Sequence, residues 1–286
     1  MLNFCHIAPI PHLYLTSKRN NHLVLAHLIE KDPDYVNFYL NEKRNYNSKI
    51  IMDNSAFEMY KAGKEMYPAD KLISMGKAIN ADYIVMPDYP GKDPVNTIDA
   101  ALEYGPKFKK EGFKTFFVPQ GTPGSLEDLI TSFEFAIHSE HVDYIGVSIL
   151  AAPLAFNCEK ENKLQRFLSR LRLMYILRER EILQKGRYMN KKFHFLGMVD
   201  GPNELIYLSP FAEFIDTWDS SAAIWLGLNN ENFDGSPSGR MDGKFEKEVD
   251  FNSEYNDNKL IQKAINNMNY IDDLVEKYYA KSETKV

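Results

Sequence analysis

The sequence has few cysteines and no long apolar run. Its 286 residues include two cysteines, Cys5 and Cys158, too few for a disulfide framework and without the CxxC spacing of a structural zinc site. No segment approaches the roughly 20 apolar residues that span a bilayer. The first residues show no basic start and no small-residue cleavage site, so no secretory signal is expected. We therefore expect reduced thiols and a cytoplasmic location, with no membrane partner.

The sequence also lacks an excess of positive charge, since the formal net charge is -6. This does not favour nucleic-acid binding, but a local basic patch can still contact phosphates. Such a patch is present from Lys160 to Lys192, where eleven Lys or Arg residues accompany three Glu residues. The segment is compatible with two interpretations, the solvated face of a long helix or a phosphate-contact surface.

No GxGxxG motif follows the first apolar run, which argues against the simplest dinucleotide-binding open sheet. Short runs rich in Ile, Val, Phe and Tyr recur instead, as is typical of strands buried on both faces. These predicted strands cover 4–10, 49–54, 82–87, 115–120, 143–148, 193–198 and 213–219. A weaker run at 22–28 is compatible with a strand or with the start of a helix.

Helical patterns lie between these runs, at 68–80, at 125–138 with Ser125 as N-cap, at 161–181 and at 259–280. Alternating strands and helices predict a parallel sheet, and eight strands would close a (β/α)₈ barrel of the TIM type in the α/β class. A doubly wound open sheet is the alternative. The polar stretch 228–258 is predicted to be a loop or small subdomain within a single domain, 1–286.

Polar residues and glycines follow the predicted strands, at the end where barrel enzymes place their catalytic groups. They are Asp53, Asp88, Gln120 with Gly121, Gly146 with Ser148, Gly197 and Asp219. Two carboxylates in one mouth suit a double-displacement glycosyl transfer. A further Asp and a Gln can bind the donor edge of a purine-like base, and glycine lets a base lie close to the backbone.

Each of these residues also has a structural explanation. A single Asp after a strand is often a helix cap or turn residue, and Asp216 competes with Asp219 for the same role. Packing is the expected role of the tryptophans, and core or surface positions are expected for four histidines without metal spacing. These residues are Trp218, Trp225, His6, His12, His27 and His194.

The ordered motifs resemble the tRNA-guanine transglycosylase superfamily, and especially its short virus-type relatives that insert 7-deazaguanine bases into DNA. From about Asp53 to Phe251, DNSAFE resembles the family's DSGGF, DYIVMPDYP its IVMAFDE, and FFVPQG its VQG. YIGVSI stands where the family has GGLAVG, HFLGMVDGP resembles YLMGVG-P, and FIDTWDSS resembles IDMFDCV. GRMDGKFEKEVDF is a looser match after the last motif.

The resemblance implies a pentosyltransferase with Asp219 as nucleophile and Asp53 as general acid/base or base-orienting carboxylate. Substrate contacts would fall on Asp88, Gln120, Gly121, the Gly146 backbone, Ser148, Gly197 and Phe57. The implied partners are DNA and a free 7-deazaguanine base, in the host cytoplasm if the protein belongs to a bacteriophage.

The chain departs from the tRNA enzymes in one respect that bears on its substrate. The zinc-binding cysteines that these enzymes carry after the nucleophile are missing, so no metal or other cofactor is expected, and a substrate other than tRNA is favoured. tRNA modification stays an alternative, as do a non-catalytic barrel that binds nucleic acid or a partner enzyme, and a hydrolase of small nucleosides.

Overall fold

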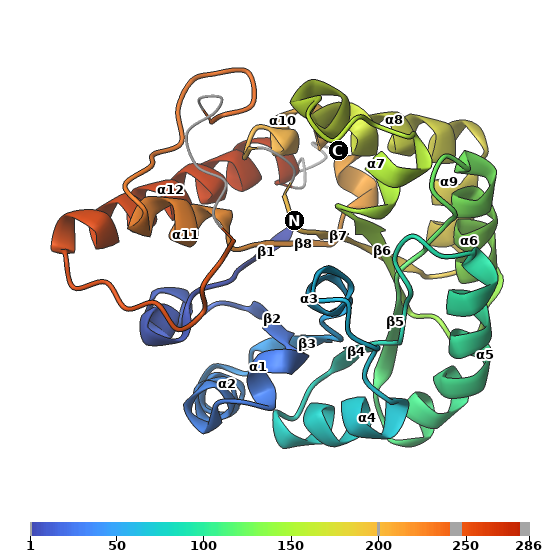
Figure 1. Cartoon of the computed structure of the whole chain (residues 1–286), viewed down its shortest axis with the longest axis horizontal. Coiled ribbons are helices and arrows are strands. Elements are labelled where there is room, and N and C mark those ends of the chain that lie inside the picture. Colours follow the sequence, from blue (N-terminus) through green and yellow to red (C-terminus); the bar gives the residue numbers. More distant parts are fainter. Residues whose placement is uncertain (1, 199–200, 241–247, 281–286) are drawn as a thin grey trace, which may run out of the picture.

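A computed structural model describes residues 2–198, 201–240 and 248–280. Its eight strands are β1 (Asn3–His6), β2 (Asn21–Leu25), β3 (Lys49–Asp53), β4 (Tyr83–Val85), β5 (Lys114–Phe117), β6 (Tyr144–Ser148), β7 (Lys192–Leu196) and β8 (Thr217–Ser220). Every hydrogen-bonded pair is parallel, in the order β1-β8-β7-β6-β5-β4-β3-β2, and β1 lies beside β2. The predicted (β/α)₈ barrel is therefore confirmed (Figure 1).

Most helices surround this barrel in Figure 1, whereas α3 lies over its middle. They are α1 (Ala26–Ile29), α2 (Pro33–Tyr46), α3 (Ala56–Lys61), α4 (Ala69–Ala78), α5 (Pro94–Lys110), α6 (Leu126–His138), α7 (Ala151–Ala155), α8 (Lys163–Glu179), α9 (Ile182–Tyr188), α10 (Glu204–Leu208), α11 (Ala222–Leu228) and α12 (Asn258–Tyr279), with the 3-10 helices η1 (Ile10–Thr16) and η2 (Ser209–Phe214). Ser125 caps α6 as predicted, because its hydroxyl accepts a hydrogen bond from the Asp128 backbone N–H.

Several predicted boundaries differ from the structure, and three of them are explained by the local sequence or backbone. The first strand ends at His6, because Pro9 and Pro11 cannot donate to a ladder. The long helix predicted at 161–181 ends at Glu179, and Glu181, with φ of 59°, separates it from α9. The strand predicted at 213–219 begins only at Thr217, after η2.

The weak run at 22–28 combines both of its proposed interpretations, since β2 ends at Leu25 and α1 begins at Ala26. The polar stretch contains no helix or strand between Asn229 and Asp257 over its described part; residues 241–247, which belong to the looser motif, lie outside that part. This stretch is joined to the barrel by a hydrogen bond from Ile10 N–H to the Phe251 carbonyl, at 2.8 Å.

The barrel interior is filled by side chains from neighbouring strands. Gly146 pairs in register with His194, and His194 with Thr217, so that one layer runs across β6, β7 and β8. A Cβ atom at Gly146 would lie 2.8 Å from both Leu196 and Phe116 side chains, closer than packing allows. Glycine is therefore required there by the barrel's own core. No helix in the described ranges has the length and apolar character that crossing a membrane requires.

Candidate active site

A cavity of about 660 Å³ opens at the C-terminal ends of the strands. Of the residues that the sequence analysis singled out, Asp53, Phe57, Asp88, Gln120, Ser148, Gly197 and Asp219 line it. The two carboxylates proposed to act together, Asp53 and Asp219, thus meet in one cavity although 166 positions separate them in the chain. Its volume is in the range of sites that enclose small molecules.

Asp219 is held at the end of β8 by two donors on β7 and the turn that follows it. His194 Nε2 lies 2.8 Å from Asp219 Oδ1, and the Gly197 N–H donates to the same oxygen at 3.2 Å. The side chain is 8% exposed. Because both contacts involve Oδ1, the other oxygen, Oδ2, is the one available to a ligand in the cavity.

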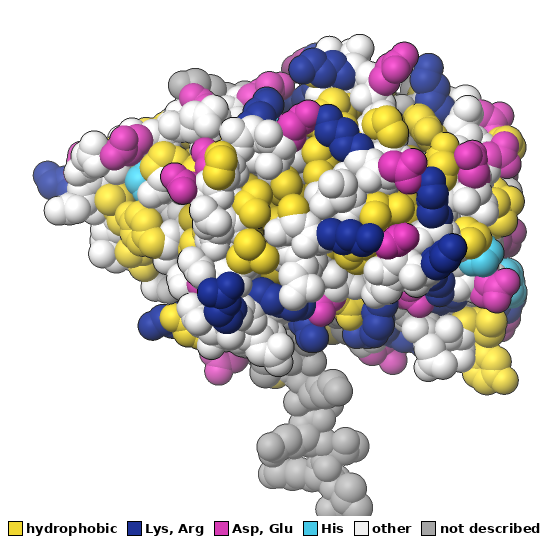
Figure 2. Space-filling model, turned by 90° about the horizontal axis from the view of Figure 1, so that it is seen from below, with side chains coloured by type: hydrophobic (Ala, Val, Ile, Leu, Met, Phe, Trp, Pro, Cys, Tyr) yellow, Lys and Arg dark blue, Asp and Glu magenta, His cyan; other side chains and the backbone are white. Residues whose placement is uncertain are grey.

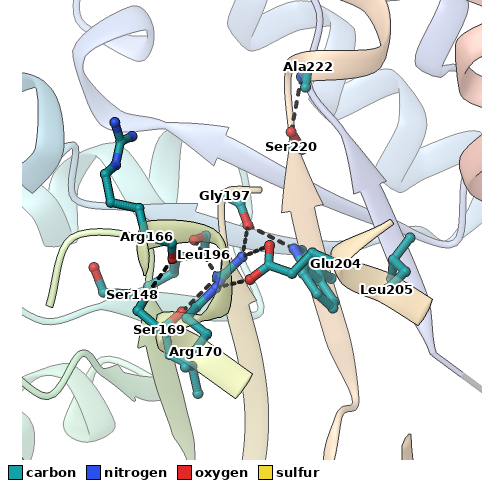
Figure 3. A network of polar contacts seen from close by, with 12 residues as sticks. Ser148, Arg166, Ser169, Arg170, Leu196, Gly197, Glu204, Leu205, Ser220 and Ala222 are labelled. Atoms are coloured by element: carbon teal, nitrogen blue, oxygen red, sulfur yellow. Dashed lines mark hydrogen bonds and ion pairs between the residues drawn. The ribbon is translucent and has the colours of Figure 1, made fainter. Parts of the chain in front are cut away.

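The turn at Gly197 is fixed from behind by a buried ion pair, shown in Figure 3. Arg170, from α8, donates to the Gly197 carbonyl at 2.8 Å and forms a two-pronged pair with Glu204 at 2.7 and 2.6 Å. Trp218 Nε1 donates to the same Gly197 carbonyl at 2.7 Å. Arg170 also donates to the Leu196 carbonyl at 2.9 Å, and this carbonyl belongs to the same peptide as the Gly197 N–H that contacts Asp219. Both peptides at Gly197 are therefore held in place, which helps to orient the carboxylate.

Asp53 faces a second carboxylate, that of Glu58, one turn into α3. Burial raises the pKa of Asp53 well above its ordinary value, and the negative charges of Glu58 and Asp219 raise it further. Burial also raises the pKa of Glu58, with Asp219 adding to the effect. The Ser55 N–H donates to Asp53 at 2.6 Å and opposes the shift only in part. The shift favours the protonated form of Asp53, which is the form that a general acid uses.

Asp88 lies at the end of β4 between two amide side chains. Asn54 Nδ2 donates to Asp88 Oδ1 at 2.7 Å, and Gln120 Nε2 donates to Asp88 Oδ2 at 2.6 Å. Burial nevertheless raises the pKa of Asp88 to about 6. The remaining amide oxygen, Gln120 Oε1, is buried without a hydrogen-bond partner in the described part of the chain. A buried acceptor of this kind is costly unless a ligand donates to it.

Basic and aromatic side chains lie nearer to solvent around the same cavity. Lys61, Arg166 and Arg240 line it, and Lys61 stands 4.6 Å from the centre of the Phe57 ring. Lys61 pairs with Glu248 at 2.8 Å, which joins α3 to the polar stretch that follows β8. The cavity therefore combines carboxylates in its interior with cations closer to its opening.

Gly121 and Gly146 are not among the residues that line the cavity. A Cβ atom at Gly121 would lie 2.8 Å from the Leu129 backbone nitrogen, so this glycine allows α6 to approach the strand end. Gly146 serves the packing of the barrel interior, as described above. Packing within the fold is therefore sufficient to explain both glycines. The expected close approach of a base to their backbone stays a prediction.

The competing carboxylate, Asp216, lies before the start of β8, at the other end of the strand from the cavity. It accepts from Arg187 at 2.7 Å and from the Phe193 N–H at 2.8 Å. Of the two tryptophans, Trp218 is fully buried, whereas Trp225 both packs and lines the cavity. The structure therefore places Asp219, and not Asp216, at the candidate site.

The basic segment from Lys160 to Lys192 does not form one continuous surface. Arg170 is fully buried, Arg180 pairs with Glu127, and Lys191 donates to two backbone carbonyls. From Arg178 onward the segment leads to the start of β7, the end opposite to the cavity. Of its residues, Arg166 lines the cavity. On the side of the molecule shown in Figure 2, basic and acidic side chains are interspersed.

The sequence analysis missed three residues of this site: Asn54, Glu58 and His194. Asn54 and Glu58 belong to DNSAFE. Both are polar side chains between the end of a strand and the first turn of the next helix, and this position could have indicated them. A core or surface position was expected for His194 because it shows no metal spacing, and its contact with Asp219 could not be predicted from the sequence.

No cluster of His, Cys, Asp or Glu suited to a metal ion occurs among the described residues. A scan against protein-family models and a search of curated proteins each gave no match. The interpretation of the site therefore rests on its geometry and on the motif resemblance.

Proposed function

We propose that the protein is a guanine transglycosylase that replaces guanine in DNA with a 7-deazaguanine derivative. The observation that carries this proposal is the meeting of Asp53 and Asp219 in one cavity with the Asp88–Gln120 pair. The two carboxylates provide a nucleophile and a proton carrier, and the pair offers acceptors to the N–H groups of a guanine-like base.

In the proposed reaction, Asp219 Oδ2 attacks C1′ of the target nucleotide. The C1′–N9 bond breaks, and guanine leaves with the electron pair and a proton from Asp53. The sugar is then bound to Asp219 as an ester. An incoming 7-deazaguanine gives its N9 proton to Asp53 and attacks C1′ through N9, so that the bond to Asp219 breaks. Both carboxyl groups return to their starting states.

Recognition of the base is assigned to Asp88 and Gln120. Gln120 Oε1, which lacks a partner in the described chain, would accept from the base, and Asp88 would accept from the exocyclic amine or the ring N–H. The target base must leave the duplex stack to reach this cavity, at a cost of a few kcal/mol. Lys61, Arg166 and Arg240 are the basic groups nearest to where the phosphates of such a nucleotide would lie.

The test is base exchange followed by mass analysis of nucleosides. Purified protein is incubated with duplex DNA, single-stranded DNA or tRNA and with a series of 7-deazaguanine bases. We expect incorporation into DNA with release of guanine. Incorporation into tRNA alone would assign the alternative substrate, and release of guanine without incorporation would assign a hydrolase. No exchange and no covalent adduct with any substrate would leave a non-catalytic binding protein.

The nucleophile is tested by Asp219→Asn, which should abolish the covalent adduct. Asp216→Asn is the matched control, because it removes the same charge three residues earlier but at the opposite end of the barrel. Full exchange activity in Asp219→Asn would refute the assignment.

A further inference from the structure

A chain of buried polar side chains leads to Asp219 through the barrel interior. His194 Nδ1 lies 2.6 Å from Thr217 Oγ1, and His194 Nε2 lies 2.8 Å from Asp219 Oδ1. His194 is fully buried, and its ring packs edge-on against Phe116 at 5.3 Å between centroids.

The Asp219 carboxylate determines which group donates at each hydrogen bond of this series. A carboxylate only accepts, so the His194 nitrogen that faces it, Nε2, must carry a proton. A neutral imidazole then has an acceptor at Nδ1, and the Thr217 hydroxyl is the group placed to donate to it. Asp219 thereby sets the tautomer, and Thr217, as the donor to Nδ1, stabilises the same one.

We propose that His194, oriented by Thr217, is a positioning residue for the nucleophile. Its N–H holds Asp219 Oδ1 against β7, so that Oδ2 points into the cavity toward C1′. This inference rests on the proposed function, because it assigns Asp219 the role of nucleophile. Without His194, the Gly197 N–H at 3.2 Å is the remaining donor described for that oxygen, and this longer bond holds the carboxylate less firmly.

A structural role alone makes a different prediction. A histidine that only fills space could be replaced by a ring of similar size without an effect on chemistry. Its tautomer would also be independent of the reaction, whereas a positioning role requires the Nε2–H form and a donor at Nδ1.

The experiment compares His194→Phe, Thr217→Val and Thr217→Ser with wild type in two measurements. Single-turnover formation of the covalent adduct with a guanine-containing oligonucleotide reports on the nucleophile, and the Kd for free guanine reports on the intact cavity. Thr115→Val is the matched control, since Thr115 is equally buried but hydrogen-bonded to Asp143 at the opposite end of the barrel.

We expect His194→Phe to slow adduct formation by about 10- to 100-fold, the range for one hydrogen bond to a charged group, with the guanine Kd changed by less than about twofold. Thr217→Val should slow it less, and Thr217→Ser should restore the wild-type rate. Thr115→Val should leave both measurements unchanged. Wild-type rates in both His194→Phe and Thr217→Val would overturn the inference.

Nitrogen-15 NMR of the histidine rings separates this inference from the proposed function. The resonance missing from His194→Phe should show the Nε2–H tautomer in wild type, and in Thr217→Val its Nδ1 signal should move toward that of a nitrogen that accepts no hydrogen bond. If the wild type forms no adduct yet shows this signature, the proposed reaction fails while the hydrogen-bond chain stands. An Nδ1–H tautomer in wild type would overturn the inference even if the adduct forms.

Discussion

The buried pair of Arg170 and Glu204 offers a sharp test of how the site is supported. Arg170 is fully buried, and it donates to Glu204 and to the carbonyls of Val147, Leu196 and Gly197. In Glu204→Gln the guanidinium keeps its charge and its burial but loses the group that neutralises it. Breaking such a pair by removing one partner costs about 3–5 kcal/mol. This is a large share of the roughly 5–15 kcal/mol that stabilise a typical domain.

The assay is urea denaturation at neutral pH, followed by circular dichroism. Glu127→Gln is the matched control, because Glu127 forms a similar two-pronged pair with Arg180 in which the two side chains are 69% and 40% exposed. Exposed pairs contribute about 0–1 kcal/mol. We therefore expect Glu204→Gln to lower the free energy of unfolding by several kcal/mol more than Glu127→Gln does.

A double substitution separates the charge from the packing. Arg170→Met with Glu204→Leu removes both charges and retains apolar volume, so it should be less destabilising than Glu204→Gln alone. Equal and small losses in Glu204→Gln and Glu127→Gln would refute the reasoning. A double variant less stable than the single one would show that the bonds from Arg170 to the three backbone carbonyls outweigh the unpaired charge.

Two further predictions concern the carboxylates. The pKa of Asp88 is raised from 3.8 to about 6, so between these pH values the folded state keeps a proton that the unfolded chain releases. This group therefore lowers the free energy of unfolding as pH rises, by up to about 3 kcal/mol above pH 6. The stability of Asp88→Asn relative to wild type, from urea titrations, should therefore rise between pH 4 and pH 7.5; a difference that does not vary with pH would contradict this. Glu58→Gln removes a charge that raises the pKa of Asp53, so the alkaline limb of the pH profile of adduct formation should move to lower pH. The exposed Glu65→Gln should leave that limb in place, and an unshifted limb in Glu58→Gln would show that Asp53 is not the proton donor.

The sequence by itself determined a parallel sheet with helical crossovers and predicted its closure into a barrel, with a doubly wound open sheet as the alternative. Short β-rich runs buried on both faces, separated by helix-forming stretches, leave few folds other than a parallel sheet with helical crossovers. It also placed Asp53, Asp88, Gln120 and Asp219 at strand ends, and parallel strands bring such ends to one side of the sheet. These conclusions needed only the alternation of elements along the chain and the direction of each strand.

Tertiary structure alone decided how these residues meet. Which face of the strand Asp219 occupies, that His194 contacts it, and that Glu58 stands close to Asp53 depend on register and on the angle at which α3 leaves β3. The same holds for Gly121 and Gly146, whose neighbours come from α6, β5 and β7. The physical reason is that contacts between elements depend on distances across the barrel, and no spacing along a single strand encodes those distances.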